Sequence, residues 1–162
     1  MSMAPGPELL GRLLDRHAAA LALYARQWCG SPEDVVQEAF VRLAAQAETP
    51  RDPAAWLFRV VRNGAISASR SETRRRKHES QAAKIDVGWF ETLDDSAIDP
   101  QTVSAAVREL ADDDREVVVL HLWGGLSFTQ IAETLESSTS TIHRRYHAAL
   151  VELRNKLLKL AK

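Results

Sequence analysis

The sequence has very little of what disulfide-bonded, zinc-bound or membrane-spanning proteins need. Cys29 is its single cysteine among 162 residues, which excludes an internal disulfide and a multi-cysteine zinc site. No apolar run approaches the roughly 20 residues that a membrane-spanning helix requires. Residues 1–11 lack the basic flank and the apolar stretch of a signal peptide. The sequence therefore predicts a cytoplasmic protein without membrane insertion.

Motifs for catalysis and cofactor binding are also missing from the sequence. There is no glycine-rich phosphate loop and no nucleophile motif. His143 and His147 are four residues apart, but such a pair on a helix more often indicates solvent exposure than a zinc site. The other three histidines, His17, His78 and His121, do not combine with carboxylates at a metal-ligand spacing. We therefore expect no metal, no cofactor and no enzymatic activity.

Glycine and proline are scarce, and the apolar residues of the first half recur at helical spacing. A first helix is expected over 10–28, with Leu14 and Trp28 on its apolar stripe. Ser31 and Pro32 are typical of the start of a second helix, which carries apolar residues up to Ala47. After a loop at 46–54, a third helix begins near Pro53, with Trp56 in the core, and continues into the basic tract at 74–77.

The second half repeats the helical pattern after a segment of different composition. Residues 81–100 are rich in Asp and Glu, which is typical of a linker, although they include Trp89 and Phe90. Helices are expected over 101–111, 113–123 and 127–135, and a turn at 136–138 precedes a long helix from Thr139. The predicted fold is all-α, with two small helical domains at 1–80 and 101–162 joined by the acidic linker.

The net charge of −1 conceals a strong segregation of charge along the chain. Residues 59–84 hold 8 Lys/Arg and 2 Asp/Glu, and residues 143–162 hold 6 and 1. Between them, residues 85–142 hold 2 Lys/Arg and 12 Asp/Glu. Two basic segments separated by an acidic one indicate two surfaces that meet a polyanion.

A short helix, a tight turn and a second helix with a polar, basic start form a helix-turn-helix pattern at 127–145. In such motifs the first residues of the second helix contact base edges and phosphates. The alternative is an ordinary pair of packed helices whose polar residues are solvated, and this pattern alone leaves both open. The candidate contacts are Thr139, Ser140, Thr141, His143, Arg144 and Arg145.

Five segments in order resemble the sigma-70 family of bacterial RNA polymerase sigma factors. In the first half these are residues 34–40 (DVVQEAF) and 55–63 (AWLFRVVRN), which resemble region two. In the second half, residues 110–120 (LADDDREVVVL), 126–135 (LSFTQIAETL) and 140–145 (STIHRR) resemble region four. The short linker points to the extracytoplasmic-function (ECF) group, which has only these two regions. The resemblance implies promoter-directed transcription initiation with core RNA polymerase and promoter DNA as partners, together with an anti-sigma factor.

The resemblance also implies a role for each surface. The second helix would bind the polymerase through Asp34, Gln37, Glu38 and Val41, which share one face at helical spacing. The third helix and the loop at 46–54 would recognise the downstream (−10) element and hold an unpaired base. The residues for this role are Arg59, Arg62, Asn63, Arg70, Arg74 and Arg75, and the helix-turn-helix candidates would read the upstream (−35) element. From the residues alone, a solvated polar face and a merely solubilising basic tract remain alternatives.

The sequence departs from the family pattern at the helix-turn-helix. Glu136 stands where the family has a glycine, Ser137 replaces an apolar residue, and His143 and Arg144 replace a common Lys-Ser pair. Two rival functions stay open: a stand-alone DNA-binding regulator, and a sigma-like decoy that binds an anti-sigma factor. The segment at 34–40 argues against the regulator, and the retained basic residues argue against the decoy.

Overall fold

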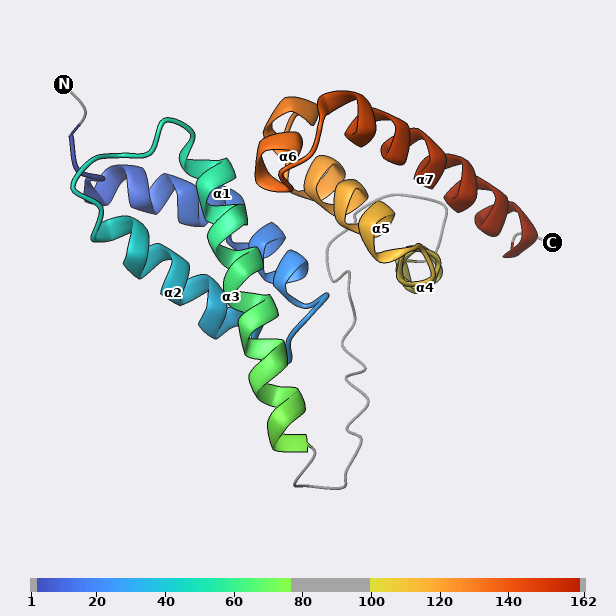
Figure 1. Cartoon of the computed structure of the whole chain (residues 1–162), viewed down its shortest axis with the longest axis horizontal. Helices are drawn as coiled ribbons and strands as arrows, with labels where there is room; N and C mark the ends of the chain where they lie inside the picture. Colours follow the sequence, from blue (N-terminus) through green and yellow to red (C-terminus); the bar gives the residue numbers. More distant parts are fainter. Residues whose placement is uncertain (1–2, 77–99, 161–162) are drawn as a thin grey trace. The chain divides into compact units, whose positions relative to one another are not determined.

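The computed structural model describes residues 3–76 and 100–160, which divide into two units, Met1–Lys84 and Ile85–Lys162 (Figure 1). Within the described ranges the regular structure is helical, and no strand occurs. The predicted all-α class with two small helical domains is confirmed. Most of the expected linker, with Trp89 and Phe90, lies outside the described residues, as does Lys77.

The first unit packs three helices against one another: α1 (Pro7–Ala25), α2 (Pro32–Ala44) and α3 (Pro53–Arg76). Each begins at a proline, whose fixed φ and missing N–H suit the first helical position. Ser31 occupies the expected N-cap of α2, but its side chain makes no capping bond. At α3 the carboxylate of Asp52 accepts a hydrogen bond from the backbone N–H of Ala55 at 3.2 Å.

The core of the first unit lies where the apolar stripes of the three helices meet. Tyr24 of α1 and Phe58 of α3 are fully buried, with ring centroids 5.7 Å apart. Gly64 of α3 faces α2 so closely that an added Cβ would lie 3.2 Å from Val35. Other fully buried core residues are Leu21, Leu43, Leu57, Val61 and Ala65.

Four expectations for the first unit are wrong in detail. The second helix ends at Ala44, so Ala47, expected on its apolar stripe, lies beyond it and is exposed. The first helix runs from Pro7 to Ala25 rather than over 10–28, and Trp28 lies in a turn with its N–H bonded to the Ala25 carbonyl. Leu14 belongs to no core stripe, because its side chain is 47% exposed. Trp56 is half-buried rather than a core residue, since the buried stripe of α3 falls on its neighbours Leu57 and Phe58.

The second unit contains α4 (Pro100–Arg108), α5 (Asp112–Val118), α6 (Phe128–Thr134) and α7 (Thr139–Leu160). The helix expected over 113–123 does not continue as an α-helix. After Val118 it becomes the π-helical turn η1 (Val119–Trp123), in which the Gly124 N–H reaches back five residues to the Val119 carbonyl at 3.0 Å. The core of the second unit consists of Val107, Val117, Leu120, Ile131 and Ile142, among others.

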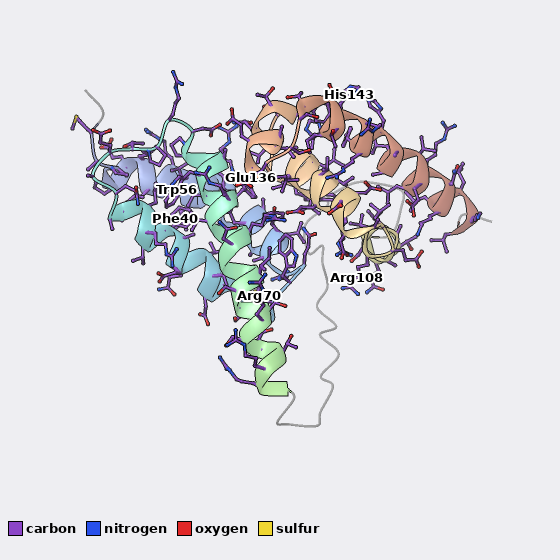
Figure 2. All side chains as sticks on the ribbon, in the orientation of Figure 1. Phe40, Trp56, Arg70, Arg108, Glu136 and His143 are labelled. Carbon is purple, nitrogen blue, oxygen red and sulfur yellow. The ribbon has the colours of Figure 1, made fainter. Side chains whose placement is uncertain are left out.

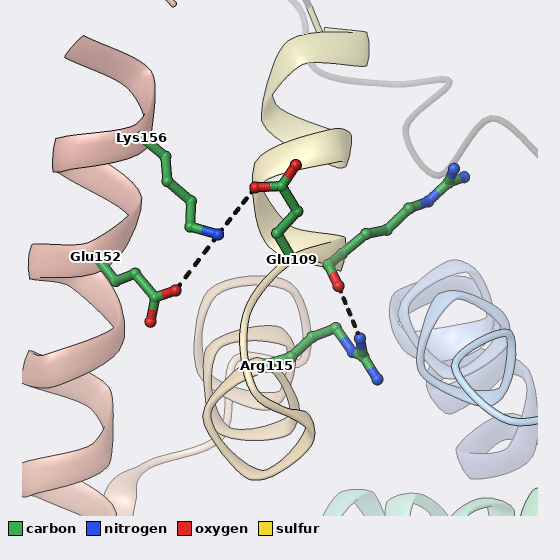
Figure 3. Close-up of polar contacts among 5 residues, drawn as sticks. Glu109, Arg115, Glu152 and Lys156 are labelled. Carbon is green, nitrogen blue, oxygen red and sulfur yellow. Dashed lines mark hydrogen bonds and ion pairs between the residues drawn. The ribbon is translucent and has the colours of Figure 1, made fainter. Parts of the chain in front are cut away.

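Polar contacts fix the far end of α7 to α4 (Figure 3). The Lys156 ammonium donates to Glu109 at 2.9 Å and lies 3.4 Å from Glu152, one turn before it on α7. The hydrogen bond to Glu109 is the main reason that the pKa of Lys156 is raised. Arg115 of α5 donates to the Arg108 carbonyl at 3.1 Å, which ties the end of α4 to α5.

Candidate nucleic-acid and protein interfaces

The outer face of α2 brings together Asp34, Gln37, Glu38 and Val41 as the spacing predicts. All four are exposed, whereas Val36, Ala39 and Leu43 on the other side are buried. Glu38 pairs with Arg42 at 3.3 Å, one turn along the same helix. Val41 is 57% exposed, which is unusual for a branched apolar side chain. The face therefore joins carboxylates with exposed apolar surface.

An apolar groove of about 470 Å³ lies between α1 and α2 and borders this face. Gln37 and Val41 belong both to its lining and to the outer face of α2. The rest of the lining is Leu14, Ala18, Ala22, Val36, Phe40 and Ala44, with Glu33 as a second polar residue; Figure 2 labels Phe40. Sequence reasoning missed the groove because Leu14 was placed in the core. Exposed apolar surface of this kind marks docking sites for partner proteins.

A second groove, of about 480 Å³, separates α2 from α3 and is more polar than the first. Asp34, Glu38 and Arg42 line it from α2, and Asn63 and Ser67 line it from α3. The groove therefore borders both the carboxylate face of α2 and the basic face of α3. Gly64 has no side chain, so α2 and α3 can approach each other closely at Val35.

The outer face of α3 is lined with cations. Arg59, Asn63 and Arg70 are exposed, and Arg74 and Arg75 continue the charge toward the end of the helix (Figure 2 labels Arg70). Arg62 differs from them, since it is half-buried with its guanidinium 5.9 Å from the centre of the Trp28 ring. Such a cation–π contact orients the guanidinium without neutralising its charge. The structure thus gathers all six predicted residues along one helix, five of them open to solvent.

The first helix of the helix-turn-helix, α6, is capped at both of its ends. At the start of α6 the Ser127 hydroxyl accepts from the Gln130 N–H at 3.1 Å, while the Gln130 side chain accepts from the Ser127 N–H at 2.7 Å. At its end the Ser137 N–H bonds the Ala132 carbonyl at 2.9 Å, and Glu136 takes a left-handed φ of 52°. This is a Schellman ending with glutamate at the position that favours glycine.

The start of α7 divides the six predicted contacts into two groups. Thr139, Ser140, His143 and Arg144 are exposed, and His143 is labelled near the start of the helix in Figure 2. Thr141 is half-buried, and its backbone N–H is capped by the Ser138 hydroxyl at 3.1 Å. Arg145 is also half-buried and lies 3.8 Å from the Asp113 carboxylate of α5.

A cluster of rings lies beside this helix start, which sequence reasoning did not predict. His121 of η1 stacks on Phe128 of α6 at 4.6 Å, and both contact Tyr146 of α7. His143 meets the edge of Phe128, and its Nε2 lies 3.2 Å from the Nε2 of His147. Among the residues that the structure describes, no three metal-ligating side chains come together. Through the contacts of Phe128 with His143 and Tyr146, the cluster packs α7 against α6.

Comparison with known proteins follows the same division of the chain. Residues 13–75 match the family description Sigma-70 region 2, and residues 101–153 match Sigma-70, region 4. The chain is 34% identical over 161 residues to the ECF RNA polymerase sigma factor SigL of Mycobacterium tuberculosis, covering 94% of this chain and 90% of SigL. It is 30% identical over 135 residues to SigK of Mycobacterium ulcerans, covering 78% and 72%.

Two solved structures resemble the fold over nearly its whole length. The sigma factor RpoE, in complex with the anti-sigma factor NepR from Bartonella quintana, aligns with a TM-score of 0.72 and 26% identity, covering 93% of this chain and 94% of RpoE. CnrH, in complex with the cytosolic domain of CnrY, aligns with a TM-score of 0.64 and 25% identity, covering 97% and 92%. No helix in the described ranges is both long and apolar enough to span a bilayer.

Proposed function

The chain belongs to the ECF group of sigma-70 family RNA polymerase sigma factors. From this we propose that one of its surfaces binds the polymerase and two others bind promoter DNA. As a sigma factor it binds core RNA polymerase and directs promoter-specific transcription initiation. The bond-forming chemistry of transcription then belongs to the polymerase, and the chain acts with it in the cytoplasm. The surfaces that carry these functions follow from exposure and charge.

The outer face of α2 is the proposed polymerase-binding surface. Asp34, Gln37, Glu38 and Val41 are exposed together, and Gln37 and Val41 border the apolar groove between α1 and α2. Apolar surface supplies affinity and the flanking carboxylates supply orientation, a combination that suits a helical partner. This observation carries the proposal most strongly, because a stand-alone DNA-binding regulator has no need of such a face.

The outer face of α3 is the proposed surface for the −10 element. Arg59, Asn63, Arg70, Arg74 and Arg75 are exposed, which suits them to follow a phosphate backbone. The loop that precedes this helix, predicted at 46–54 and ending at Asp52 in the structure, would receive the unpaired base. Since the four arginines among them are exposed to solvent, a decoy that has lost DNA binding is disfavoured.

The start of α7 is the proposed surface for the −35 element. Thr139, Ser140, His143 and Arg144 are exposed where a recognition helix meets the major groove. Arg145 joins them when it exchanges Asp113 for DNA, and Thr141 contributes through the cap that shapes the helix start. Since RpoE of Bartonella quintana is seen with an anti-sigma factor, we propose that this chain is also held by one.

Run-off transcription with core polymerase and a promoter library tests the proposal. The parent chain is expected to give discrete promoter-specific transcripts. Glu38→Lys reverses a charge at the centre of the α2 face and is expected to weaken association with core polymerase at least about tenfold, or about 1.4 kcal/mol. Glu8→Lys makes the same change at an exposed position of α1 and serves as the matched control. If Glu38→Lys co-purifies with the polymerase as well as the parent does, the α2 assignment is wrong.

The DNA surface needs a separate variant in the same assay. Replacing Arg59, Arg62 and Asn63 together by Ala is expected to block promoter opening while polymerase association persists, because unpaired bases are no longer held. Pre-melted promoter DNA should partly restore transcription, since the unpairing cost is then already met. Arg12→Ala with Arg16→Ala, two exposed cations of α1, is the control. Normal permanganate reactivity of promoter thymines in the triple variant would remove this role from α3.

A further inference from the structure

The segment that precedes α1 crosses to the loop between α2 and α3 and bonds to its middle. The Met3 carbonyl accepts two hydrogen bonds from Thr49, one from the backbone N–H at 2.9 Å and one from the hydroxyl at 2.6 Å. Figure 1 shows this start of the chain, in blue, beside the teal loop that leads into α3. Residues 3–6, called here the N-terminal strap, thus reach a residue 46 positions away in the sequence.

The strap is short and stiff, so the position of the Met3 carbonyl depends on the position of α1. Pro5 is buried, although the Met3 side chain is 78% exposed, so the strap packs through its proline rather than through its methionine. Gly6 is the N-cap of α1 and Pro7 its first residue. Two prolines fix two φ angles within five residues, which limits the positions that the Met3 carbonyl can take. Because the core holds α1 in place, the stiff strap also restricts the position of Thr49, to which it is bonded.

The loop at 45–52 is pinned at both ends and, through the strap, at its centre. At one end the Ala45 N–H bonds the Val41 carbonyl at 3.1 Å. At the other end Asp52 caps α3 through its carboxylate and its backbone carbonyl, which accept from Ala55 and Trp56. Thr49 lies between these anchors. Its bonds to Met3 therefore limit the conformations of the middle of the loop, which the two helices do not hold. Exposed Arg51 follows two residues later and places a cation beside the pinned position.

We propose that the N-terminal strap is a positioning element for promoter opening: it holds the loop at 45–52 in the form that receives the unpaired base of the −10 element. The proposal rests on the proposed function, which assigns that base to this loop and α3. A loop held in place before binding loses less conformational entropy when the base enters, and the saving appears as tighter capture of single-stranded DNA. Met3 and Thr49 act through the loop and need not touch the DNA.

Two pairs of variants isolate the strap. A chain that starts with an initiator Met directly before Gly6 lacks the Met3 carbonyl, whereas a chain that starts at Met3 keeps it and is the matched control. Thr49→Val removes the hydroxyl donor with little change of shape, and Thr49→Ser keeps the donor as the conservative control. Each chain is assembled with core polymerase, and its affinity is measured for a single-stranded non-template −10 oligonucleotide and for core polymerase itself.

The expected result is a loss of affinity for the single-stranded oligonucleotide and not for core polymerase. Thr49→Val should bind the oligonucleotide about fivefold more weakly, as follows from one lost hydrogen bond, and the chain starting at Gly6, which loses both bonds, should bind it at least as weakly. Thr49→Ser and the chain starting at Met3 should match the parent, and all five chains should bind core polymerase alike. On duplex promoters the two weakened chains should open DNA more slowly than the parent. With pre-melted DNA, the difference in transcription between them and the parent should be smaller.

Other outcomes separate the two proposals. Equal oligonucleotide binding by the parent, Thr49→Val and the chain starting at Gly6 would overturn the strap while leaving the −10 assignment in place. A matching loss of polymerase affinity would show that the strap merely supports the fold and would also overturn its positioning role. If the parent holoenzyme itself fails to retain the oligonucleotide, the −10 assignment of the loop is wrong, and the positioning proposal is wrong with it.

Discussion

Glu136 occupies the tightest backbone position of the helix-turn-helix. Its φ of 52° lies in the left-handed region, which costs a residue with a Cβ about 1–2 kcal/mol. The Ser137 N–H bond to the Ala132 carbonyl requires this conformation, because it closes the Schellman ending of α6. The angle between α6 and α7 is therefore maintained against local strain by the packing of both helices.

Glu136→Gly is expected to raise the free energy of unfolding of the second unit by about 0.5–1 kcal/mol. The gain is the relieved strain, reduced by the greater entropy of glycine in the unfolded chain. Urea unfolding followed by circular dichroism measures it. Glu133→Gly, three residues earlier within α6, is the matched control and should destabilise by about 1 kcal/mol. A lower stability of Glu136→Gly than of the parent would show that the glutamate side chain contributes more than its backbone strain costs.

The stability of the first unit is expected to depend on pH through His17. Its ring lies edge-on to Phe58 at 6.1 Å, and burial lowers its pKa, with Arg16 lowering it further and Asp52 opposing both. Since the folded pKa lies below the unfolded value of about 6.5, the unfolded chain takes up the proton more readily. Stability from this group is complete above about pH 6.5 and is lost as the pH falls from there toward the folded pKa.

His17→Gln is expected to flatten that dependence. The variant removes the titrating group but keeps a polar side chain, so its stability at pH 5 should fall less from its pH 7 value than the parent's does. Thermal unfolding at half-unit steps of pH provides the measurement. Identical slopes for the two proteins would mean that another group governs the acid sensitivity of the first unit.

At the scale of elements, α7 presents two neighbouring arginines in different settings. Arg144 is exposed, whereas the side chain of Arg145 is 35% exposed and lies 3.8 Å from Asp113. The Asp113 side chain is itself 71% exposed, and an ion pair so open to water contributes at most about 1 kcal/mol. Arg145 can therefore leave Asp113 for a phosphate or a guanine at little cost.

Arg144→Ala and Arg145→Ala are each expected to weaken use of the −35 element by about 1–3 kcal/mol if the arginine contacts a base. Holoenzyme affinity for duplexes with single changes in that element is the measurement, because a base contact relaxes preference at one position only. Asp113→Ala is the control for Arg145 and should leave DNA affinity intact. If Asp113→Ala reproduces the loss seen in Arg145→Ala, that arginine acts by holding α5 against α7 rather than by touching DNA.

The elements also show where sequence reasoning succeeds and where it stops. Helix starts at Pro32, Pro53 and Thr139 were predictable, because prolines and capping residues act locally. The end of α1 and the π-helical turn at η1 were not, since apolar spacing continues through both and packing decides where the α-helix stops. The bond between Met3 and Thr49 has no local signal at all, as its partners are 46 residues apart.

For the whole molecule, the distribution of charge matters more than its sum. The net charge is −1, yet the cations of α3 and α7 form separate exposed faces, while residues 85–142 carry a large acidic excess. On the proposed assignment, each face alone would meet only a few phosphates, and a near-neutral chain has no general attraction to DNA. We therefore expect tight promoter binding only when the polymerase holds both units at once.

The free chain is accordingly expected to bind duplex promoter DNA weakly and without sequence preference. Its dissociation constant at physiological salt should fall in the non-specific range of about 10⁻⁴–10⁻⁶ M and should rise steeply with salt, because counterion release supplies most of the affinity. Fluorescence anisotropy with promoter and scrambled duplexes, at several salt concentrations and with or without core polymerase, measures both quantities. Adding polymerase should create a preference for the promoter that neither component has alone. Specific binding by the free chain near 10⁻⁸ M or tighter, unchanged by polymerase, would instead identify a stand-alone regulator, and the outer face of α2 would lose its assigned partner.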